Sequence, residues 1–392
     1  MKPLKYLFIS SMLFVATSCG NSWLDLEPST SVDTETSIKI LSDVEFTLNG
    51  IYSTMQSSDA YSGRLVYYGD VTGDDMQAVS STKRVANYYR FNFTKDDNPS
   101  SHWSYLYSII QNCNLILMNI DKLVIDEGDK AYRDDLKGEA LAIRGLALFD
   151  LTRIFGYPYL KDKGASLGVP IIEGLSTIDS KPARNTVAQC YTKVIDDLTQ
   201  SISLLGEKFN KGKINKWGAM VLLSRVYLYK GENANALEMA EKAIAGAEKN
   251  KYALWTNEDY PTAWGEDASA SKPGEVLFEI VNLTTDSPGK ESMGYLNSYD
   301  GYDDMCITCS FYQFLKEDPK DIRLKLLSFD KKYYAYVNKY QPQREENIED
   351  ANIPLIRLSE AYLNAAEAAV KENDNDAAVK YLDPIVRRAN PD

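Results

Sequence analysis

The stretch LIRLSEAYLNAAEAAVKENDNDAAVKYLDPIVRRA, residues 355–389, decides the fold. It predicts a helix, a short turn at residues 372–374 (END) and a second helix. Small residues recur where the paired helices must approach each other, at Ala361, Ala366 and Ala377. This pattern is typical of a tetratricopeptide-style hairpin, which buries its apolar face only by stacking on a neighbour.

A second stretch, residues 217–247, has the same organisation around a short turn at residues 231–233 (GEN). Small residues stand at the corresponding helix contacts, Ala219, Ala236 and Ala240. Because the two hairpins are not in tandem along the chain, we expect other helices to fill the space between them.

Helical periodicity also dominates the first half of the chain, where apolar residues recur at intervals of three and four. One stripe comprises Val44, Leu48, Ile51, Tyr52 and Met55, and another comprises Trp103, Leu106, Tyr107, Ile110, Asn114, Leu117 and Met118. A third helix is expected over about residues 133–155, ending at Gly156 before Pro158. Thr186 and Gln189 have the spacing of a capping box and precede a further stripe, Tyr191, Val194, Ile195, Leu198, Ile202 and Leu205.

Two segments lack helical periodicity, residues 56–100 and 250–310, and both are rich in Gly, Ser and Asp. Within the second, residues 275–281 (EVLFEIV) favour one short strand. Loops of this length are usually functional or disordered, and their aromatic residues argue against disorder. The predicted fold is mainly α, with tetratricopeptide-like helical hairpins packed against an irregular, loop-rich lobe that has little β structure.

The N-terminus has the features of an export signal. Lys2 and Lys5 flank the start of an apolar run that extends to residue 15, and three small residues then lead to Cys19. This pattern predicts a lipoprotein signal peptide over residues 1–18 and lipid attachment at Cys19. The alternative is an ordinary signal peptide followed by an incidental cysteine.

We expect a single domain over residues 19–392. Its helical scaffold is predicted at about residues 36–56, 101–250 and 311–392. Its ligand lobe is predicted at about residues 57–100 and 251–310. Both assignments follow from where helical periodicity is present and where it is missing.

The composition argues against several classes of function. A chain of 392 residues with a formal net charge of −13 is unsuited to binding nucleic acid. His102 is the single histidine and stands at the expected start of a helix, which argues against Ser-His and Cys-His catalysis and most zinc sites. Cys306 and Cys309 form a lone CxxC, for which a local disulfide or two free thiols is favoured over a metal or redox site. We therefore expect no catalytic residues and no enzyme, although paired carboxylates could still hydrolyse glycosides.

Taken in order, the motifs resemble the SusD/RagB family of outer-membrane nutrient-binding lipoproteins of Bacteroidota. The resemblance covers nearly the whole mature chain and rests on the order of many short motifs. They are Cys19, Trp23-Leu24-Asp25 and Pro28; Trp103, Leu106-Tyr107, Ile110 and Asn114; Glu139-Ala140, Arg144 and Phe155-Gly156-Tyr157-Pro158; Arg184-Asn185-Thr186, Tyr191, Ile195 and Asp197-Leu198; Lys216 to Leu228; Asp321 and Arg323; and Ile353-Pro354, Arg357-Leu358, Glu360 to Leu363, Ala366-Glu367-Ala368 and Arg387-Arg388-Ala389.

This resemblance implies a scaffold of tetratricopeptide-like pairs, lipid anchoring at the outer membrane facing outwards, and nutrient uptake without bond chemistry. It implies a partner, a SusC-like TonB-dependent transporter, to which captured glycans or, in some branches, peptides are passed. The family normally continues past its Arg-Ala block, whereas this sequence stops at Asp392, so we expect a chain shortened at its C-terminus.

Sugars present flat C–H faces ringed by hydroxyl groups, which an aromatic ring with nearby polar groups can satisfy. The chain has 27 tyrosines against 12 phenylalanines, and tyrosine offers both an apolar face and a polar tip. We expect ligand-binding residues in the irregular segments, at Tyr295, Asn297, Tyr299, Asp300 and Tyr302, with a second group at Tyr67, Tyr68, Asp74 and Arg84. The alternative is that these tyrosines pack the core of the lobe, as we expect for Trp264.

Charged residues of the motifs are expected to be structural. Arg357 and Glu360, three apart on one predicted helix face, and also Arg144 are predicted to lie in buried or half-buried ionic networks. No cofactor is expected. A structural calcium ion at Asp300, Asp303 and Asp304 is conceivable, although their spacing lacks a full EF-hand loop.

Three functions stay open at this point. The chain could capture oligosaccharide for a transporter, bind peptides in the manner of RagB or in the concave face of its hairpins, or act as a carboxylate-based glycosidase. The tyrosine-rich loops and the shortage of catalytic groups favour the first.

Overall fold

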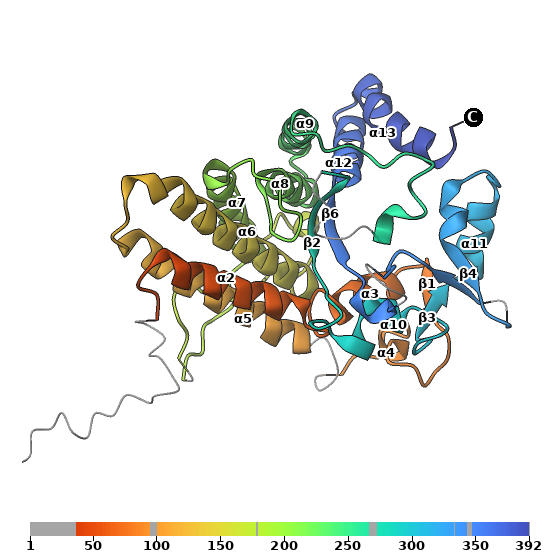
Figure 1. Cartoon of the computed structure of the whole chain (residues 1–392), viewed down its shortest axis with the longest axis horizontal. Coiled ribbons are helices and arrows are strands. Elements are labelled where there is room, and N and C mark those ends of the chain that lie inside the picture. Colours follow the sequence, from red (N-terminus) through yellow and green to blue (C-terminus); the bar gives the residue numbers. More distant parts are fainter. Residues whose placement is uncertain are drawn as a thin grey trace, which may run out of the picture.

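The computed structural model describes residues 37–94, 100–177, 179–265, 273–332, 334–342 and 347–391. The predicted signal peptide and Cys19 lie outside these residues. The described chain is mainly helical, as the sequence predicts, and has only short strands. A helical scaffold occupies one side of the molecule, and a lobe of short elements occupies the other (Figure 1).

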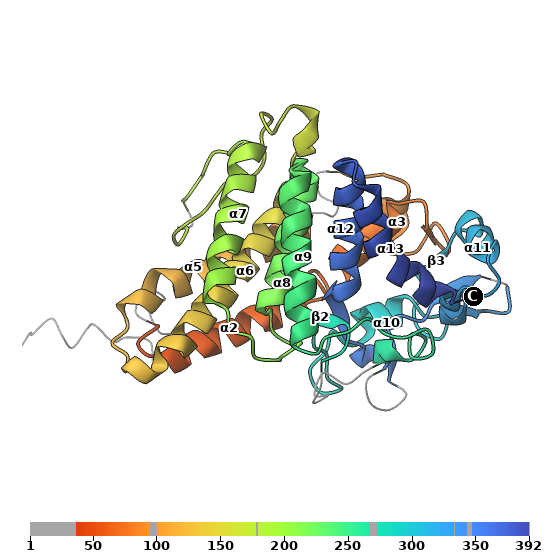
Figure 2. The ribbon, with the colours of Figure 1, turned by 90° about the horizontal axis from the view of Figure 1, so that it is seen from above.

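The scaffold is a row of long helices in which each helix packs against the next. The helices are α2 (Leu41–Gln56), α5 (Ser100–Asn119), α6 (Lys130–Phe155), α7 (Val187–Leu204), α8 (Lys216–Lys230), α9 (Asn233–Lys249), α12 (Leu358–Lys371) and α13 (Asn375–Ala389). Seen from above, α7, α9, α12 and α13 follow one another across the molecule (Figure 2). The three periodic stripes of the sequence therefore correspond to α2, α5 and α7, and the helix expected over about residues 133–155 corresponds to α6.

Helix α6 is the centre of the scaffold. Every residue from Gly138 to Thr152 is buried, because α6 packs against α5 on one side and α7 on the other. A helix that is enclosed all round does not need a polar face, which explains the run of apolar and small residues. Within it, Arg144 donates from Nε and Nη2 to the two carboxylate oxygens of Asp197, at 2.8 and 2.7 Å. This buried ion pair confirms the expected structural role of Arg144.

Local signals fix the ends of several helices. The capping box of α7 is present, since Gln189 N donates to Thr186 Oγ1 at 3.2 Å and Thr186 N donates to Gln189 Oε1 at 2.9 Å. Helix α8 is capped by Asn215 and stops at Gly231, whose φ of +79° is readily adopted by glycine. Helix α6 ends before Gly156, as predicted.

The two hairpins α8–α9 and α12–α13 stack directly on each other, and the expectation that other helices fill the space between them is wrong. Helix α12 lies against both α9 and α8. Arg225 on α8 holds Glu360 on α12 with two bonds, at 2.5 and 2.7 Å, and Asn364 donates to Ser224 at 2.8 Å. The lobe is inserted between hairpins that are neighbours in space.

Strand β2 (Val276–Ile280) confirms the predicted strand and pairs antiparallel with β6 (Ile353–Arg357). Residues 355–357, which the sequence assigned to a helix, belong to this strand. Their partner lies far away along the chain, so local periodicity did not reveal the pairing. Arg357 and Glu360 consequently do not form one helix face, because Arg357 donates to Glu275 at 2.9 Å whereas Glu360 binds Arg225.

The lobe is built from short elements in two separate segments of the chain, which we call its first and second pass. The first pass gives α3 (Arg64–Val71), β1 (Met76–Ala78) and α4 (Ala86–Tyr89), and the second gives α10 (Met293–Leu296), β3 (Met305–Ile307), α11 (Cys309–Lys316), β4 (Leu327–Phe329) and β5 (Ala335–Val337). β1 pairs antiparallel with β3, and β4 with β5. Residues 311–352 therefore belong to the lobe, not to the scaffold as predicted, and the chain re-enters the scaffold at β6.

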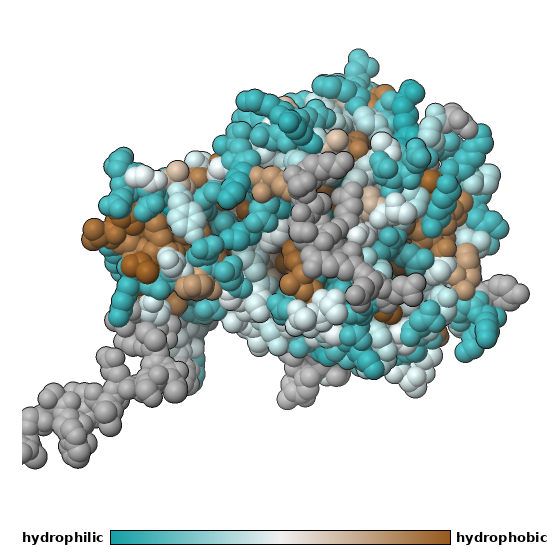
Figure 3. Space-filling model, viewed as in Figure 1, coloured by the Kyte–Doolittle hydropathy of each residue, from teal (hydrophilic) through white to brown (hydrophobic). Residues whose placement is uncertain are grey.

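Short 3₁₀ turns lie between the elements of both regions. Those in the scaffold are at Ile120–Lys122, Glu127–Asp129 and Tyr159–Lys161, and the later ones are at Ala263–Gly265, Gly289–Glu291, Ile322–Leu326 and Ile348–Asp350. Over the described ranges, no helix has the length and apolar character needed to cross a membrane. The visible face is largely hydrophilic, with apolar side chains gathered at the scaffold end farthest from the lobe (Figure 3). Exposed residues of this end include Ile40, before α2, and Val124, between α5 and α6.

Candidate functional site

Two groups of residues that the sequence singled out meet in the lobe. Tyr295 lies on α10, whose start is capped by Ser292, and its ring centroid is 5.0 Å from that of Tyr302 in an edge-to-face arrangement. The guanidinium of Arg84, from the first pass of the chain, lies 3.8 Å from the centre of the Tyr302 ring. Arg84 and the two tyrosines thus form one surface, although more than two hundred residues separate them in the sequence.

Acidic side chains hold Arg84 in this position. Its Nη1 is 3.2 Å from Asp304 Oδ2, and its Nη2 is 3.3 Å from Glu291 Oε1. Asp304 is buried, whereas the Arg84 side chain is 37% exposed. Burial acts to lower the pKa of Arg84, but the carboxylates of Asp304 and Glu291 outweigh it and raise the pKa, so the guanidinium stays charged. A cation is therefore fixed over an aromatic face and remains open to solvent.

Tyr299 lies in the same loop as Tyr302, between α10 and β3. Its side chain is 46% exposed, and its ring centroid is 5.8 Å from that of Tyr336. The Tyr336 hydroxyl donates to Asp303, which is also 3.5 Å from Lys83 Nζ. Asp300 is exposed beside Tyr299, and its backbone N–H donates to Ser298 Oγ. We call Arg84, Tyr295, Tyr299 and Tyr302 the aromatic surface.

The remaining predicted residues occupy different environments. Tyr67 is buried, with its ring edge-to-face against Tyr88, and Asn297 is buried and donates to the carbonyl of Val337 at 2.6 Å. Tyr68 is half-buried among other aromatic rings. Asp74 is exposed, and its carbonyl accepts from Thr308 Oγ1 at 2.9 Å. The structure thus brings Arg84, from the second predicted group, to the tyrosines of the first group and leaves Tyr67 in the interior.

The structure places the residues considered for a metal or redox site in separate environments. Asp303 and Asp304 face Lys83 and Arg84, and the described ranges contain no group of three or more His, Cys, Asp and Glu side chains placed to hold a metal. Cys306 is buried and Cys309 is exposed, and both are free thiols. Burial raises the pKa of Cys306 to about 11, so its thiol stays protonated at neutral pH.

His102 lies near the start of α5, as the sequence indicates, and it is fully buried. Its Nδ1 is 3.2 Å from the carbonyl oxygen of Asp59, and its ring packs against Tyr68. Burial lowers its pKa, which favours the neutral imidazole.

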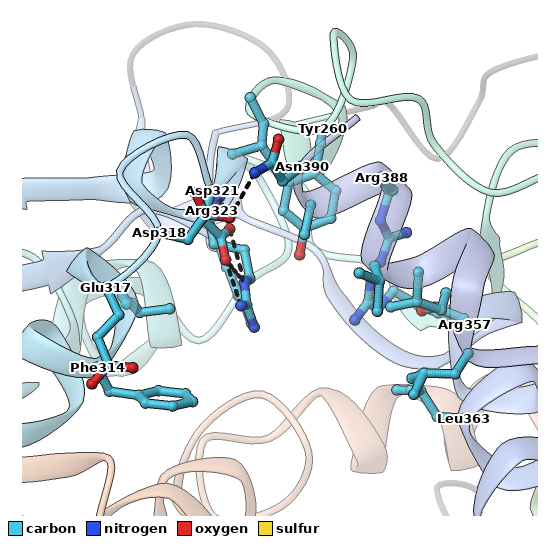
Figure 4. Close-up of a pocket in the computed structure, with 18 residues that line it drawn as sticks. Tyr260, Phe314, Glu317, Asp318, Asp321, Arg323, Arg357, Leu363, Arg388 and Asn390 are labelled. Atoms are coloured by element: carbon cyan, nitrogen blue, oxygen red, sulfur yellow. Dashed lines mark hydrogen bonds and ion pairs between the residues drawn. The ribbon is translucent and has the colours of Figure 1, made fainter. Parts of the chain in front are cut away.

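A cavity of about 670 Å³ lies between the second pass of the lobe and α13 (Figure 4). Arg323 and Asp321 form one wall, and Arg357 and Arg388 form the opposite wall. Arg357 and Arg388 both bind the buried carboxylate of Glu275, at 2.9 and 2.5 Å. The four wall residues belong to motifs that carried the family resemblance, but the sequence did not predict the cavity, because the motifs come from segments that are far apart in the chain.

Beside the cavity lies an aromatic cluster of Trp255, Tyr260 and Trp264, of which Tyr260 also lines the cavity. Trp264 is buried, as the sequence analysis expected, and its ring centroid is 5.0 Å from that of Trp255. The Arg357 guanidinium lies 4.6 Å from the Trp264 ring centre. The charges of the cavity wall are therefore largely engaged by neighbours, and Phe314, Leu363, Leu382 and Val386 give it an exposed apolar rim.

Comparison with known proteins identifies the family. A family model described as starch-binding and associating with the outer membrane matches residues 22–228, and the SusD family model matches residues 325–392. A crystal structure of a candidate sugar-binding protein from Bacteroides vulgatus is 82% identical, with a TM-score of 0.89, and the match covers 91% of this chain and 80% of that one. A SusD superfamily protein from the same species is 37% identical, with a TM-score of 0.85, over 90% of this chain and 81% of that one.

Among curated relatives, SusD-like protein P2 of Formosa agariphila is 28% identical over 313 residues, which is 77% of this chain and 57% of the relative. The chain thus matches little more than half the length of that relative. The two family models match residues 22–228 and 325–392, and the fold agrees with the two crystal structures over about nine-tenths of this chain. The chain belongs to the SusD family.

Proposed function

We propose that this protein captures oligosaccharide at the aromatic surface and delivers it to a SusC-like TonB-dependent transporter in the outer membrane. The observation that carries the proposal is the stacking of Arg84 on Tyr302 beside Tyr295 and the exposed Tyr299. An aromatic face binds the C–H face of a pyranose ring, and the neighbouring guanidinium and carboxylates bind its hydroxyl groups. The description of the matching family as starch-binding supports the same class of ligand.

The surface is suited to binding more than to chemistry. Glu291 and Asp304 both face Arg84, so neither is placed as an isolated acid opposite a second carboxylate. A glycosidase needs two carboxyl groups that flank the scissile bond with different protonation states. The proposal is accordingly capture without cleavage, and product analysis after incubation with each bound glycan checks it.

The test of capture is a glycan array screened with the chain from Asn21 onward, followed by calorimetry on each hit. The Tyr295/Tyr299/Tyr302→Ala triple variant should lose the hit while keeping the wild-type circular dichroism spectrum. The control is Tyr132→Ala, which removes from the scaffold helix α6 a tyrosine about as exposed as Tyr299. Retained binding by the triple variant would exclude the aromatic surface, and hits on peptide arrays alone would favour peptide cargo.

We further propose that Cys19 carries the lipid that holds the protein at the outer membrane. Cys19→Ser should abolish incorporation of labelled palmitate and move the protein from the membrane to the soluble fraction, because the acyl chains supply the membrane affinity. Co-purification of a TonB-dependent transporter with the wild-type protein from detergent-solubilised membranes tests the delivery partner. A transporter that never co-purifies, under conditions that keep the lipoprotein folded, contradicts that pairing.

A further inference from the structure

A second cavity, of about 390 Å³, lies where the scaffold meets the lobe. Most of its lining residues come from α3, α6, α8 and β6. The polar and aromatic side chains that could contact a ligand are Tyr68, Asp150, Arg153, Arg225 and Tyr229. Ligand pockets commonly form where two parts of a fold meet, and this volume lies at the lower end of their usual range. The aromatic surface contributes none of the residues that line this cavity.

The polar wall of this cavity is held in place by its own contacts. Asp150 accepts from the hydroxyl of buried Tyr61 at 2.8 Å and forms an ion pair with Arg153. Arg153 Nη1 also donates to the Tyr229 hydroxyl at 3.3 Å. Arg225 is fixed by Glu360 through two bonds. Side chains already ordered in this way lose little conformational entropy when a ligand arrives.

A sugar also needs an apolar surface for its C–H face. The rings of Tyr68 and Tyr229 and the aliphatic side chains of the lining provide it. Tyr229 is 48% exposed, so its ring is available to a ligand. A carboxylate accepts hydrogen bonds and a guanidinium donates them, so Asp150 and Arg153 together can bind two adjacent hydroxyl groups of one ring. Arg153 and Arg225 are each paired with a carboxylate, so the charges of the wall are balanced. We therefore expect no preference for a charged sugar over a neutral one.

We infer that this cavity is a second carbohydrate subsite, which takes one neutral pyranose unit. The inference rests on the proposed function only in assuming that the ligand of the protein is a glycan. It places recognition at the junction of scaffold and lobe in addition to the aromatic surface.

Gly69 offers a way to close the cavity without touching its charges. It lines the cavity on the exposed side of α3, and apart from the adjoining residues of its own helix no described atom lies within 4 Å of the position that its Cβ would take. Gly69→Trp should therefore fill the entrance and leave the fold intact. Gly50→Trp is the matched control, because Gly50 is also an exposed helical glycine with no described atom within 4 Å, but it lies on α2.

The probes are maltotriose, laminaritriose and mannotriose, which are short enough for one molecule to occupy one subsite. Calorimetry on wild type should show two equivalents of the bound trisaccharide, with one lost in Gly69→Trp and the other lost in the Tyr295/Tyr299/Tyr302→Ala variant. Gly50→Trp should keep both. If Gly69→Trp fails to fold, Tyr229→Ala replaces it and should weaken the same equivalent by about tenfold, the cost of one aromatic contact.

The outcomes separate the two ideas. If the wild type binds only one equivalent of trisaccharide, and Gly69→Trp keeps this binding whereas the triple variant loses it, the second subsite is overturned. The proposed function then stands. If the wild type binds only one equivalent and only Gly69→Trp loses it, the result supports the subsite and contradicts glycan binding at the aromatic surface. Absence of binding to all three probes by the folded wild type overturns the second subsite for neutral pyranoses, and the glycan array then decides the proposed function separately.

Discussion

The scaffold and the lobe hold their charged side chains in different ways. Arg144 in the scaffold donates two bonds to Asp197, and both side chains are more than nine-tenths buried. Arg84 in the lobe reaches Asp304 and Glu291 through longer contacts and remains partly open to solvent above a tyrosine ring. Burial makes the first pair part of the structure, whereas exposure leaves the second available to a ligand. The following experiments test this division.

The largest effect is expected from Arg144→Ala. Removing the guanidinium leaves the carboxylate of Asp197 buried and without its bidentate partner, although Lys193 Nζ lies 3.2 Å away. Breaking a buried pair in this way typically costs about 3–5 kcal/mol in the free energy of unfolding. Urea denaturation followed by circular dichroism measures it. The control Arg387→Ala removes one partner of an exposed pair on α13 and should change stability by less than about 0.5 kcal/mol. Equal losses for the two variants would contradict the assigned role of Arg144.

The next effect concerns Glu139, another buried group of the scaffold. Burial raises its pKa to about 7, although nearby Lys213 and the hydrogen bond from the Tyr52 hydroxyl oppose the shift. Between the unfolded pKa near 4.5 and about pH 7 the folded chain binds more protons at this site, so stability falls as pH rises through this window. The fall should reach at most about 3 kcal/mol and be absent below the unfolded pKa.

Glu139→Gln tests this assignment, because a neutral amide can still accept from Tyr52. The variant should remove this part of the pH dependence and be more stable than wild type at pH 8. Thermal melting at several pH values measures both. A variant whose stability falls with pH as steeply as that of wild type would place the titrating group elsewhere.

In the lobe, Arg84→Ala should affect binding more than stability. The contacts of Arg84 are partly exposed, and such pairs contribute about 0–1 kcal/mol to folding. The loss of a cation over an aromatic face and of its hydrogen bonds should weaken glycan binding by about tenfold or more. Calorimetry and thermal melting on the same preparations compare the two effects, with Arg90→Ala as the control from the same pass of the lobe. A stability loss as large as that of Arg144→Ala, without a change in affinity, would erase the contrast between the regions.

The scaffold and the lobe also differ in how far the sequence predicts them. The periodic stripe that starts at Val44 and the capping box at Thr186 specify helices locally, so α2 and α7 were foreseen. Strand β6 was missed because residues 353–357 find their partner at β2, far away along the chain. Likewise, no local pattern shows that Arg84 meets Tyr302. Tyrosine suits both the interior and a half-wet surface, so the sequence did not distinguish buried Tyr67 from exposed Tyr299.

The smallest effect is expected from calcium. Asp303 and Asp304 are the carboxylates of the acidic run nearest to a cation, and they already face Lys83 and Arg84. A calcium ion would have to displace both cations, and ions that do not bind the folded state do not stabilise it. Added calcium should therefore shift the melting temperature by less than about 1 °C. Asp300→Asn, which removes the exposed carboxylate of the run, should respond in the same way. A saturable rise in melting temperature that Asp300→Asn abolishes would make this part of the lobe a metal site. The carboxylates near Arg84 would then bind calcium as well as the guanidinium, and the position of Arg84 would depend on the ion.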